Sequence, residues 1–382
     1  MKLLHWLRTI KKHFVHYDPS VKILISKTNL LHNLKEYQKK YPTLLCAPVL
    51  KSNAYGHGLI PIAQILDKQQ LPFFVLDSLY EAMLLRDAGI HSKILIIGYT
   101  SADNIRHSTL AHIAFVITSL EQLQEVANAI TTTTTIHLKI DTGMHRQGIL
   151  PHQIPDALHI IQANTFLSLD GVCSHFADAD NPDATFTKSQ IVCWEKAVAI
   201  CKQQCRSIQY FHISATSGAL YSKQISGNVI RLGLGLYGIP ASSLYSLDLK
   251  PVLRMQSVIS SIKHLKAGER IGYNGTYTTP SDITVATVPV GYFEGIDRRL
   301  SNCGHFTIGT TLCPIVGRVS MNITSIDVTQ TPSAKLGDKV TLISNNRNES
   351  NSVEKIASLI QMIPYEFLVH IPQHIRRTII EH

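Results

Sequence analysis

Short apolar runs alternate with amphipathic stretches eight times between residues 44 and 245. A run of about 4–8 apolar residues indicates a buried strand, and apolar residues at helical spacing indicate a helix that covers it. The stretches Leu79–Ala88, which Gly89 ends, and Leu120–Ile130 are long enough to form right-handed crossover helices. Eight strand-plus-helix units match a (β/α)8 barrel in both number and length. The predicted strands lie near residues 44–50, 73–76, 93–97, 113–117, 136–140, 167–174, 209–213 and 229–232.

After Pro251 the pattern changes to β-rich segments separated by Gly, Asn, Pro and Ser turns. One helix is predicted over Val353–Met362, because Ser352 is a favourable N-cap residue. The predicted fold class is therefore α/β, with an N-terminal TIM barrel over residues 21–250 and a C-terminal, mostly β domain over residues 251–382. The predicted strands of the second domain are Met255–Ile262, Ile283–Val290, Ile323–Val328 and Lys339–Ser344.

The composition of the 382 residues, 45% hydrophobic and 16% charged, is typical of a well-buried globular protein. No apolar stretch of the sequence approaches the roughly 20 residues that a membrane span requires. The seven cysteines are scattered, and their spacing contains no zinc ligand set. These features predict a protein of the reducing cytoplasm without a metal site.

The net charge of +9 raises the question of nucleic-acid binding. The sequence has no long run of Lys and Arg and no basic stripe that alternates with aromatic residues, so no nucleic-acid partner is predicted. An anionic cofactor or substrate also suits a basic surface. Residues 1–20 form a basic, amphipathic extension, which either lies on a membrane surface or docks on the protein body. Its apolar residues at helical spacing are Leu3, Trp6, Leu7, Ile10 and Phe14.

Chemically suitable side chains follow the predicted barrel strands, at the ends where TIM-barrel enzymes carry their sites. Lys51 ends the first strand, where a lysine often only caps the strand. Apolar surroundings there would destabilise its charged form and make it nucleophilic toward an aldehyde. Arg146 follows the fifth strand, and His175 ends the sixth. Turns suited to an anion follow the seventh and eighth strands, at residues 214–219 and 231–238.

Taken together, these residues resemble the alanine racemase family of pyridoxal-phosphate enzymes, and the resemblance covers about residues 22–377. It implies a homodimer that acts on a small amino acid with pyridoxal 5′-phosphate as its cofactor. It also places the active sites at the subunit interface, where residues 251–382 contribute to the partner's site. The motifs are Lys51–Gly58, Asp141–Met144 before Arg146, Arg231–Gly238, Gly272–Tyr273, Gly291–Arg298, Gly317–Met321 and Tyr365–Glu366.

The resemblance assigns catalysis to two bases. Lys51 would form the aldimine with pyridoxal phosphate and act as one base, and Tyr273 of the partner subunit would act from the opposite face. Inversion needs both, because one proton leaves one face of the carbon and another arrives at the other face. His175, backed by Arg231, would supply positive charge near the tyrosine. Arg231 would also meet the pyridine nitrogen and leave it mostly unprotonated, which favours prompt reprotonation.

The remaining site residues are likewise implied by the resemblance. Arg146 would contact the phenolic oxygen of the cofactor or the substrate carboxylate, and the N–H of Met321 from the partner would complete the carboxylate site. Lys139 matches a lysine that is carbamylated in some family members and orients the arginine. The phosphate would be held by Tyr55, Thr216, Ser217, Tyr365 and the backbone of Gly233 and Leu234, and the substrate entrance would be narrowed by Tyr273, Tyr365, Arg298 and Asp180.

The chain departs from the family pattern at a few positions, none of which is a proposed base. Asn322 stands where aspartate is common after the methionine, and Asn274 stands where glycine usually follows the tyrosine. Because both touch the presumed substrate end, they leave the strictness for alanine open. The other departures are Phe293–Glu294 in place of Ala-Asp, Thr216 in place of asparagine and His374 in place of arginine.

The sequence therefore predicts a cytoplasmic, homodimeric racemase that interconverts L- and D-alanine and supplies D-alanine for the peptidoglycan of a bacterial cell wall. An amino-acid racemase of broader range is the main alternative. A decarboxylase of the same fold fits less well, because Arg231 rather than a carboxylate would meet the ring nitrogen. A non-catalytic carrier of the cofactor would not need a second domain that contains Tyr273 and Met321.

Overall fold

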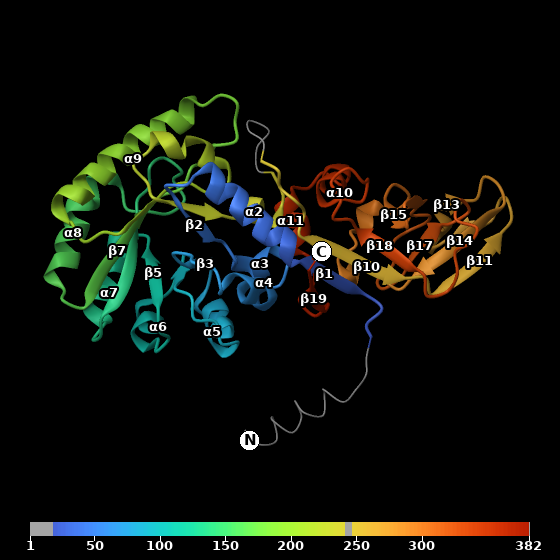
Figure 1. Cartoon of the computed structure of the whole chain (residues 1–382), viewed down its shortest axis with the longest axis horizontal. Helices are drawn as coiled ribbons and strands as arrows, with labels where there is room; N and C mark the ends of the chain where they lie inside the picture. The colour runs from blue at the N-terminus through green and yellow to red at the C-terminus, as the bar shows by residue number, and fades with distance from the viewer. Residues whose placement is uncertain (1–17, 241–246, 382) are drawn as a thin grey trace, which may run out of the picture.

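A computed structural model describes residues 18–240 and 247–381, and the predicted extension over residues 1–20 lies almost entirely outside them. The described chain forms two lobes, a barrel with surrounding helices and a second, strand-rich domain (Figure 1). Within the described ranges, no helix is both long enough and apolar enough to cross a membrane.

All eight predicted barrel strands are present and lie around one ring. The strands β3 to β8 are hydrogen-bonded in chain order, and β2 pairs with β9. A bridge between Val49 and Val75 joins β2 to β3, and the Arg231 N–H donates to the Ser214 carbonyl at 3.0 Å between β8 and β9. The ring is closed, so the predicted TIM barrel is confirmed. Its strands are β2 (Leu45–Pro48), β3 (Phe74–Leu76), β4 (Ile94–Ile96), β5 (Ile113–Ile117), β6 (Thr134–Lys139), β7 (Leu167–Cys173), β8 (Tyr210–His212) and β9 (Val229–Leu232).

Helices cover the outside of the barrel (Figure 1). Ser78 and Ser119 cap two of them, because each side chain accepts a hydrogen bond from a backbone N–H of the first turn. Gly89, at φ +77°, follows α5 as predicted. The helices are α2 (Lys27–Lys40), α3 (Lys51–Tyr55), α4 (Leu59–Leu66), α5 (Leu79–Asp87), α6 (Ala102–His107), α7 (Leu120–Ala129), η1 (Pro151–Gln153), α8 (Ile154–Ala163) and α9 (Thr185–Gln204).

The last two barrel units differ from the predicted pattern. β8 is followed by the 3-10 helix η2 (Ser217–Gln224) and β9 by the 3-10 helix η3 (Leu234–Tyr237), and among the residues that the structure describes neither unit has an α-helix at this point. The helix α2 packs against η3, and the Asn33 amide donates to the Leu236 carbonyl at 3.1 Å. α2 therefore covers the part of the barrel that the short eighth helix does not cover. Local periodicity in the sequence does not reveal this contact, because the two segments are far apart along the chain.

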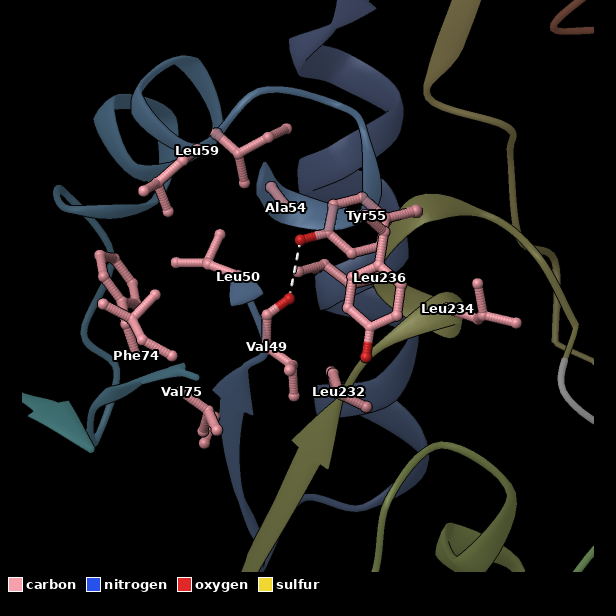
Figure 2. Packing of buried hydrophobic residues seen from close by; sticks show 14 of the residues in the cluster. Val49, Leu50, Ala54, Tyr55, Leu59, Phe74, Val75, Leu232, Leu234 and Leu236 are labelled. Atoms are coloured by element: carbon pink, nitrogen blue, oxygen red, sulfur yellow. Dashed lines mark hydrogen bonds between the residues drawn. The ribbon is translucent and has the colours of Figure 1, made fainter. Parts of the chain in front are cut away.

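The chain after β2 is fixed by apolar packing. Figure 2 shows Leu50 beside Phe74 and Val75 of β3, with Leu232 and, farther away, Leu234 from the β9 segment across Val49. All five of these side chains are buried. The hydroxyl of Tyr237 donates to the Val49 carbonyl at 2.8 Å. This packing determines where the following residue, Lys51, emerges at the carboxyl end of the barrel.

The second domain contains two main sheets. The larger has the strand order β16-β15-β18-β10-β1-β19 and the smaller has the order β11-β14-β17. The predicted strand Met255–Ile262 is in fact two strands, because β10 and β11 join different sheets. The predicted cap is present, since Ser352 accepts from the Lys355 N–H and begins α10. The elements are β10 (Leu253–Val258), β11 (Ser261–Leu265), β12 (Arg270–Ile271), η4 (Tyr273–Gly275), β13 (Tyr277–Thr278), β14 (Ile283–Val288), η5 (Tyr292–Glu294), η6 (Arg298–Leu300), β15 (His305–Ile308), β16 (Thr311–Pro314), β17 (Thr324–Asp327), β18 (Lys339–Ile343), α10 (Val353–Leu359) and α11 (Pro364–Val369).

The first described strand, β1 (Lys22–Ser26), belongs to the sheet of the second domain. It pairs antiparallel with β10 and parallel with β19 (Arg377–Ile380). β1 lies inside the predicted barrel domain, which begins at residue 21. It nevertheless pairs with strands of the second domain and not with strands of the barrel. The two ends of the described chain meet in one sheet, which ties the start of the barrel to the second domain.

Candidate active site

A cavity of about 420 Å³ opens at the carboxyl ends of the barrel strands. Its volume falls within the roughly 300–1,000 Å³ of small-molecule sites. A second cavity, of about 380 Å³, is lined by residues that include Lys93 and Asp170 and by none of the predicted site residues. The first cavity brings together these predicted residues: Lys51, Tyr55, Lys139, Arg146, His175, Asp180, Thr216, Ser217, Arg231, Gly233 and Tyr365.

Lys51 precedes a turn of left-handed backbone. Ser52, Asn53 and Ala54 have φ between 52° and 57°, a conformation that destabilises L-residues by about 1–2 kcal/mol each. Three contacts, two of them from distant segments, oppose this strain. The Ser52 N–H donates to Glu81 Oε1 at 2.7 Å, the Leu59 N–H donates to Asn53 Oδ1 at 2.9 Å, and Arg377 donates to the Gly56 carbonyl at 2.8 Å.

The amine of Lys51 lies at the wall of the cavity, and its side chain is 34% exposed. Its Nζ is 3.8 Å from Asp77 Oδ1. The carboxylate of Glu81 connects the backbone beside Lys51 to that of Asp77, because Oε2 accepts from the Asp77 N–H and Oε1 accepts from the Ser52 N–H. The ends of β2 and β3 are thereby held together around the amine.

Small residues after β8 and β9 form a cradle for an anion. Thr216 and Ser217 lie at the start of η2, and Gly233 directly precedes η3, so the first residues of both 3-10 helices line the cavity. The Gly233 N–H donates to Thr216 Oγ1 at 3.1 Å. A Cβ at Gly233 would lie 2.9 Å from the Tyr55 hydroxyl, so only glycine leaves room between backbone and phenol. Burial raises the pKa of Tyr55, which keeps its hydroxyl a hydrogen-bond donor.

Arg231 is the central cation of the cavity and is only 6% exposed. Its Nη1 donates to His212 Nδ1 at 2.6 Å, and its Nη2 donates to His175 Nδ1 at 2.9 Å. A guanidinium has only donors, so both Nδ1 atoms must accept, and a neutral ring then carries its proton on Nε2. His212 Nε2 in turn lies 2.9 Å from His137 Nδ1. Arg231 thus determines the tautomers of three histidines, the buried His212 and His137 and the partly buried His175.

His175 is a neutral ring and not a source of positive charge. Burial, followed by the positive charge of Arg231, lowers the pKa of His175 to about 3. The expectation that His175 contributes to a cationic neighbourhood is therefore wrong, because the ring cannot gain a proton in a buried place beside a permanent cation. The positive charge belongs to Arg231, and His175 offers an Nε2–H donor.

Lys139 and Arg146 lie on the side of the cavity formed by β6 and its following loop. Burial chiefly lowers the pKa of Lys139, and the charges of Arg146 and Arg231 lower it further, although Cys173 and Asp141 act in the opposite direction. Its Nζ donates to Gln147 Oε1 at 3.4 Å. The loop is held by Asp141, whose carboxylate accepts the Gly143 and His145 N–H groups. Arg146 is exposed and lines the opening.

Four predicted site residues, Tyr273, Arg298, Met321 and Leu234, do not line this cavity within one chain. Tyr273, Arg298 and Met321 belong to the second domain and do not line it. Tyr273 and Met321 are instead 69% and 54% exposed. Tyr365 and Asp180 do line the opening, and burial together with the charge of Asp180 raises the pKa of Tyr365. Leu234 is buried and begins η3 directly after Gly233.

The prediction missed His212, Asp77 and Glu81. His212 ends the seventh predicted strand, so the signal that indicated His175 was also present there. Glu81 forms a capping box with Ser78, a motif that is visible in the sequence, whereas its contact with Ser52 depends on the meeting of two strands. Across the described ranges, no group of three or more His, Cys, Asp or Glu side chains is arranged to hold a metal ion.

Two family models match the chain in succession. The model of the alanine racemase N-terminal domain matches residues 25–241, and that of the C-terminal domain matches residues 252–379. The chain is also similar to the alanine racemase of Syntrophobacter fumaroxidans, with 36% identity over 344 residues, or 88% of this chain and 91% of that protein. The alanine racemase of Methylacidiphilum infernorum is 34% identical over 334 residues, which cover 86% of this chain and 84% of that protein.

Solved structures agree with these matches. The crystal structure of alanine racemase from E. faecalis has a TM-score of 0.88 at 29% identity and covers 96% of this chain and 99% of its own. The alanine racemase from Bacillus anthracis with bound L-Ala-P has a TM-score of 0.87 at 27% identity and covers 96% of each chain. Because the two family models and these relatives span both domains, the chain belongs to the alanine racemase family.

Proposed function

We propose that this protein is a pyridoxal-phosphate-dependent alanine racemase that interconverts L- and D-alanine with two opposed bases. The observation that carries the proposal is one cavity that contains a strand-end lysine, a buried arginine and an anion cradle. Family membership supports the same reaction, since the relatives are named alanine racemases.

The residues of the cavity fit pyridoxal phosphate. The turn at Thr216, Ser217 and Gly233 suits a phosphate, with the hydroxyls of Tyr55 and Tyr365 on the same cavity. The rings of these two tyrosines lie 5.8 Å apart between centroids. Lys51 would hold the cofactor through its amine, and Arg231 would donate to the ring nitrogen. When bound, the cofactor supplies an electron sink for the charge left on the substrate carbon.

The chain's own residues move the protons. Lys51 removes or returns a proton on one face of the substrate carbon, and Tyr273 of the partner subunit acts on the other face. The neutral His175 donates from Nε2 toward the tyrosine oxygen and favours its deprotonated form, with Arg231 as the nearby positive charge. Arg146 and the N–H of Met321 from the partner hold the carboxylate. Lys139 orients Arg146 when it is carbamylated, because the unmodified, cationic lysine would repel the arginine. Tyr365, Asp180, Tyr273 and Arg298 narrow the entrance.

A homodimer is part of this proposal. An exposed apolar surface on a protein often marks a contact with another molecule. The second domain exposes several such side chains close to the proposed partner residues in sequence, so residues 251–382 would complete the active site over residues 21–250 of the partner. These side chains are Tyr273, Tyr292, Phe293, Met321 and Ile323.

The cellular role follows from the reaction. All seven cysteines are free thiols, which supports a reducing compartment such as the cytoplasm. D-alanine made there would supply peptidoglycan. Arg231 at the ring nitrogen supports a racemase over a decarboxylase, because an arginine leaves that nitrogen mostly unprotonated. A racemase that accepts a broader range of amino acids is the second candidate. It is favoured by Asn322, which replaces the aspartate common in the family and donates to Glu294 in the second domain.

The test is to add pyridoxal phosphate to the purified protein and to follow its visible absorption, optical rotation and loss of Cα deuterium from L-alanine. L-serine and L-lysine measure the range. Lys51→Ala should lose the protein-bound absorption and all racemisation, and activity that survives this change would overturn the mechanism. Tyr273→Phe should lose turnover of one enantiomer more severely than the other, whereas Tyr80→Phe, at an exposed helix position, should change neither.

A further inference from the structure

Four positions that depart from the alanine racemase pattern meet in pairs in the second domain. The Asn322 amide donates to Glu294 Oε1 at 2.7 Å. The rings of Phe293 and His374 stack with their centroids 4.9 Å apart and their planes at 28°. The replacements are thus not independent, because each contacts another.

Three of these four residues, Phe293, Glu294 and Asn322, belong to two backbone segments, residues 291–294 and residues 320–322, which we call the clasp. The Tyr292 N–H donates to the Ser320 carbonyl and the Phe293 N–H donates to the Met321 carbonyl, both at 3.0 Å. Glu294 Oε2 accepts from the Gly291 N–H at 2.8 Å. Gly291 permits this approach, since a Cβ there would lie 2.1 Å from the Ser320 carbonyl oxygen.

The clasp sets the direction of one N–H group. In a trans peptide the C=O and the N–H point in opposite directions. The Ser320 carbonyl points at the Tyr292 N–H, so the Met321 N–H of the same peptide points away from residues 291–294. This is the N–H that the proposed function assigns to the substrate carboxylate in the partner's site.

We infer that Asn322 and Glu294 are positioning residues for the Met321 N–H. This inference rests on the proposed racemase function and deepens it. The carboxylate of Glu294 spans both segments, because one oxygen accepts from Gly291 and the other from Asn322. An amide at residue 322 makes this a hydrogen bond between a donor and an acceptor. Two carboxylates at the same distance would repel each other or share one proton.

The test uses Asn322→Asp in the cofactor-loaded dimer, with KM for L-alanine and the dissociation constant of propionate measured from pH 6 to pH 9. Propionate is a carboxylate that cannot react, so its binding reports the carboxylate site without turnover. We expect both constants to rise about 10-fold at high pH, as one charge-assisted hydrogen bond weakens, and to recover at low pH as the carboxyl pair takes up a proton. The kcat should change by less than about 3-fold, since the bases are untouched.

Two further variants separate positioning from general destabilisation. Asn346→Asp makes the same change beside Glu349, whose Oε1 accepts from the Asn346 amide at 3.2 Å on an exposed loop, and it should leave both constants unchanged. Glu294→Gln combined with Asn322→Asp reverses the donor and acceptor, and it should restore both constants. The wild-type protein is measured over the same pH range. Any effect of His374, whose ring packs on Phe293, is then present in both and is removed by the comparison.

The outcomes distinguish the two proposals. Constants for Asn322→Asp that match wild type at every pH, or a double variant that fails to restore them, would overturn the positioning role. Failure of the wild-type protein to racemise any amino acid would overturn the proposed function. Propionate binding would in that case still decide whether the clasp shapes a carboxylate site.

Discussion

Arg231 shows how one buried side chain determines the chemistry of several others. It is 6% exposed and donates to His212 and to His175, and His212 lies in contact with His137 across the inside of the barrel. Burial and the arginine's charge lower the pKa of His175 and His137, each to about 3, and lower that of His212. The three rings are therefore neutral at physiological pH, with protons on defined nitrogens.

Acid should destabilise the protein through these histidines. Their folded pKa values lie below the unfolded value of about 6.5, so the unfolded chain binds the extra protons. Stability is fully present above about pH 6.5 and falls by up to about 1.4 kcal/mol per pH unit and histidine as the pH drops toward 3. Urea unfolding between pH 7 and pH 5 measures this slope. His137→Gln should reduce it, His159→Gln on an exposed helix position should not, and equal slopes in both would contradict the argument.

At the scale of elements, the left-handed turn after β2 is positioned by its neighbours. The turn stores strain at four successive residues, Ser52 to Tyr55, and Glu81 from α5, Arg377 from β19 and the start of α4 each bond to it. Elements from both domains thus converge on the backbone beside Lys51. Gly56 ends the turn at φ +79° with its Cα against the Leu368 carbonyl.

Gly56→Ala should be far more destabilising than Gly89→Ala. Both glycines have φ near +78°, so alanine strains the backbone by about 1–2 kcal/mol in each case. A Cβ at Gly56 would lie 2.1 Å from the Leu368 carbonyl oxygen, whereas at Gly89 it would meet nothing within 4 Å. The clash should add about 1–3 kcal/mol at Gly56 alone. Free energies of unfolding in urea measure both, and equal losses would show that the contact with α11 does not constrain the turn.

At the scale of the whole molecule, the chain is two lobes joined through β1, β10 and β19 (Figure 1). The barrel carries the cavity with Lys51, while Tyr273 and Met321 are exposed on the second domain. A single chain therefore displays the two parts of the proposed site separately. A two-fold dimer would join the barrel of each chain to the second domain of the other.

Mixing Lys51→Ala with Tyr273→Phe should raise the racemisation rate above that of either variant alone. In the proposed dimer each site takes Lys51 from one subunit and Tyr273 from the other, so a hybrid of Lys51→Ala and Tyr273→Phe has one intact site. Random exchange of equal amounts should yield about a quarter of the wild-type rate, since half of the dimers are hybrids with one working site each. The racemisation rate after unfolding and refolding the mixture measures this. No gain over the separate variants would place both residues in one subunit's site.

The sequence by itself determined the features that depend on local order along the chain. The apolar periodicity predicted all eight barrel strands, because a buried strand must be apolar wherever its partners lie. The residues at strand ends, such as Lys51, His175 and Arg231, then follow, since parallel strands in a barrel present their carboxyl ends on one rim. Their meeting in one cavity needed no further information.

Only the tertiary structure decided what depends on contacts between distant segments. β1 joins the second domain and α2 covers the end of the barrel because pairing and packing partners are chosen in space, which short-range patterns do not encode. The same reason explains why the role of Glu81 was not predicted. Its capping motif is local, but its hydrogen bond to the Ser52 N–H joins two segments that are distant in sequence. It also explains why the neutral state of His175 was not predicted. That state comes from burial beside Arg231, and burial is a property of the folded chain.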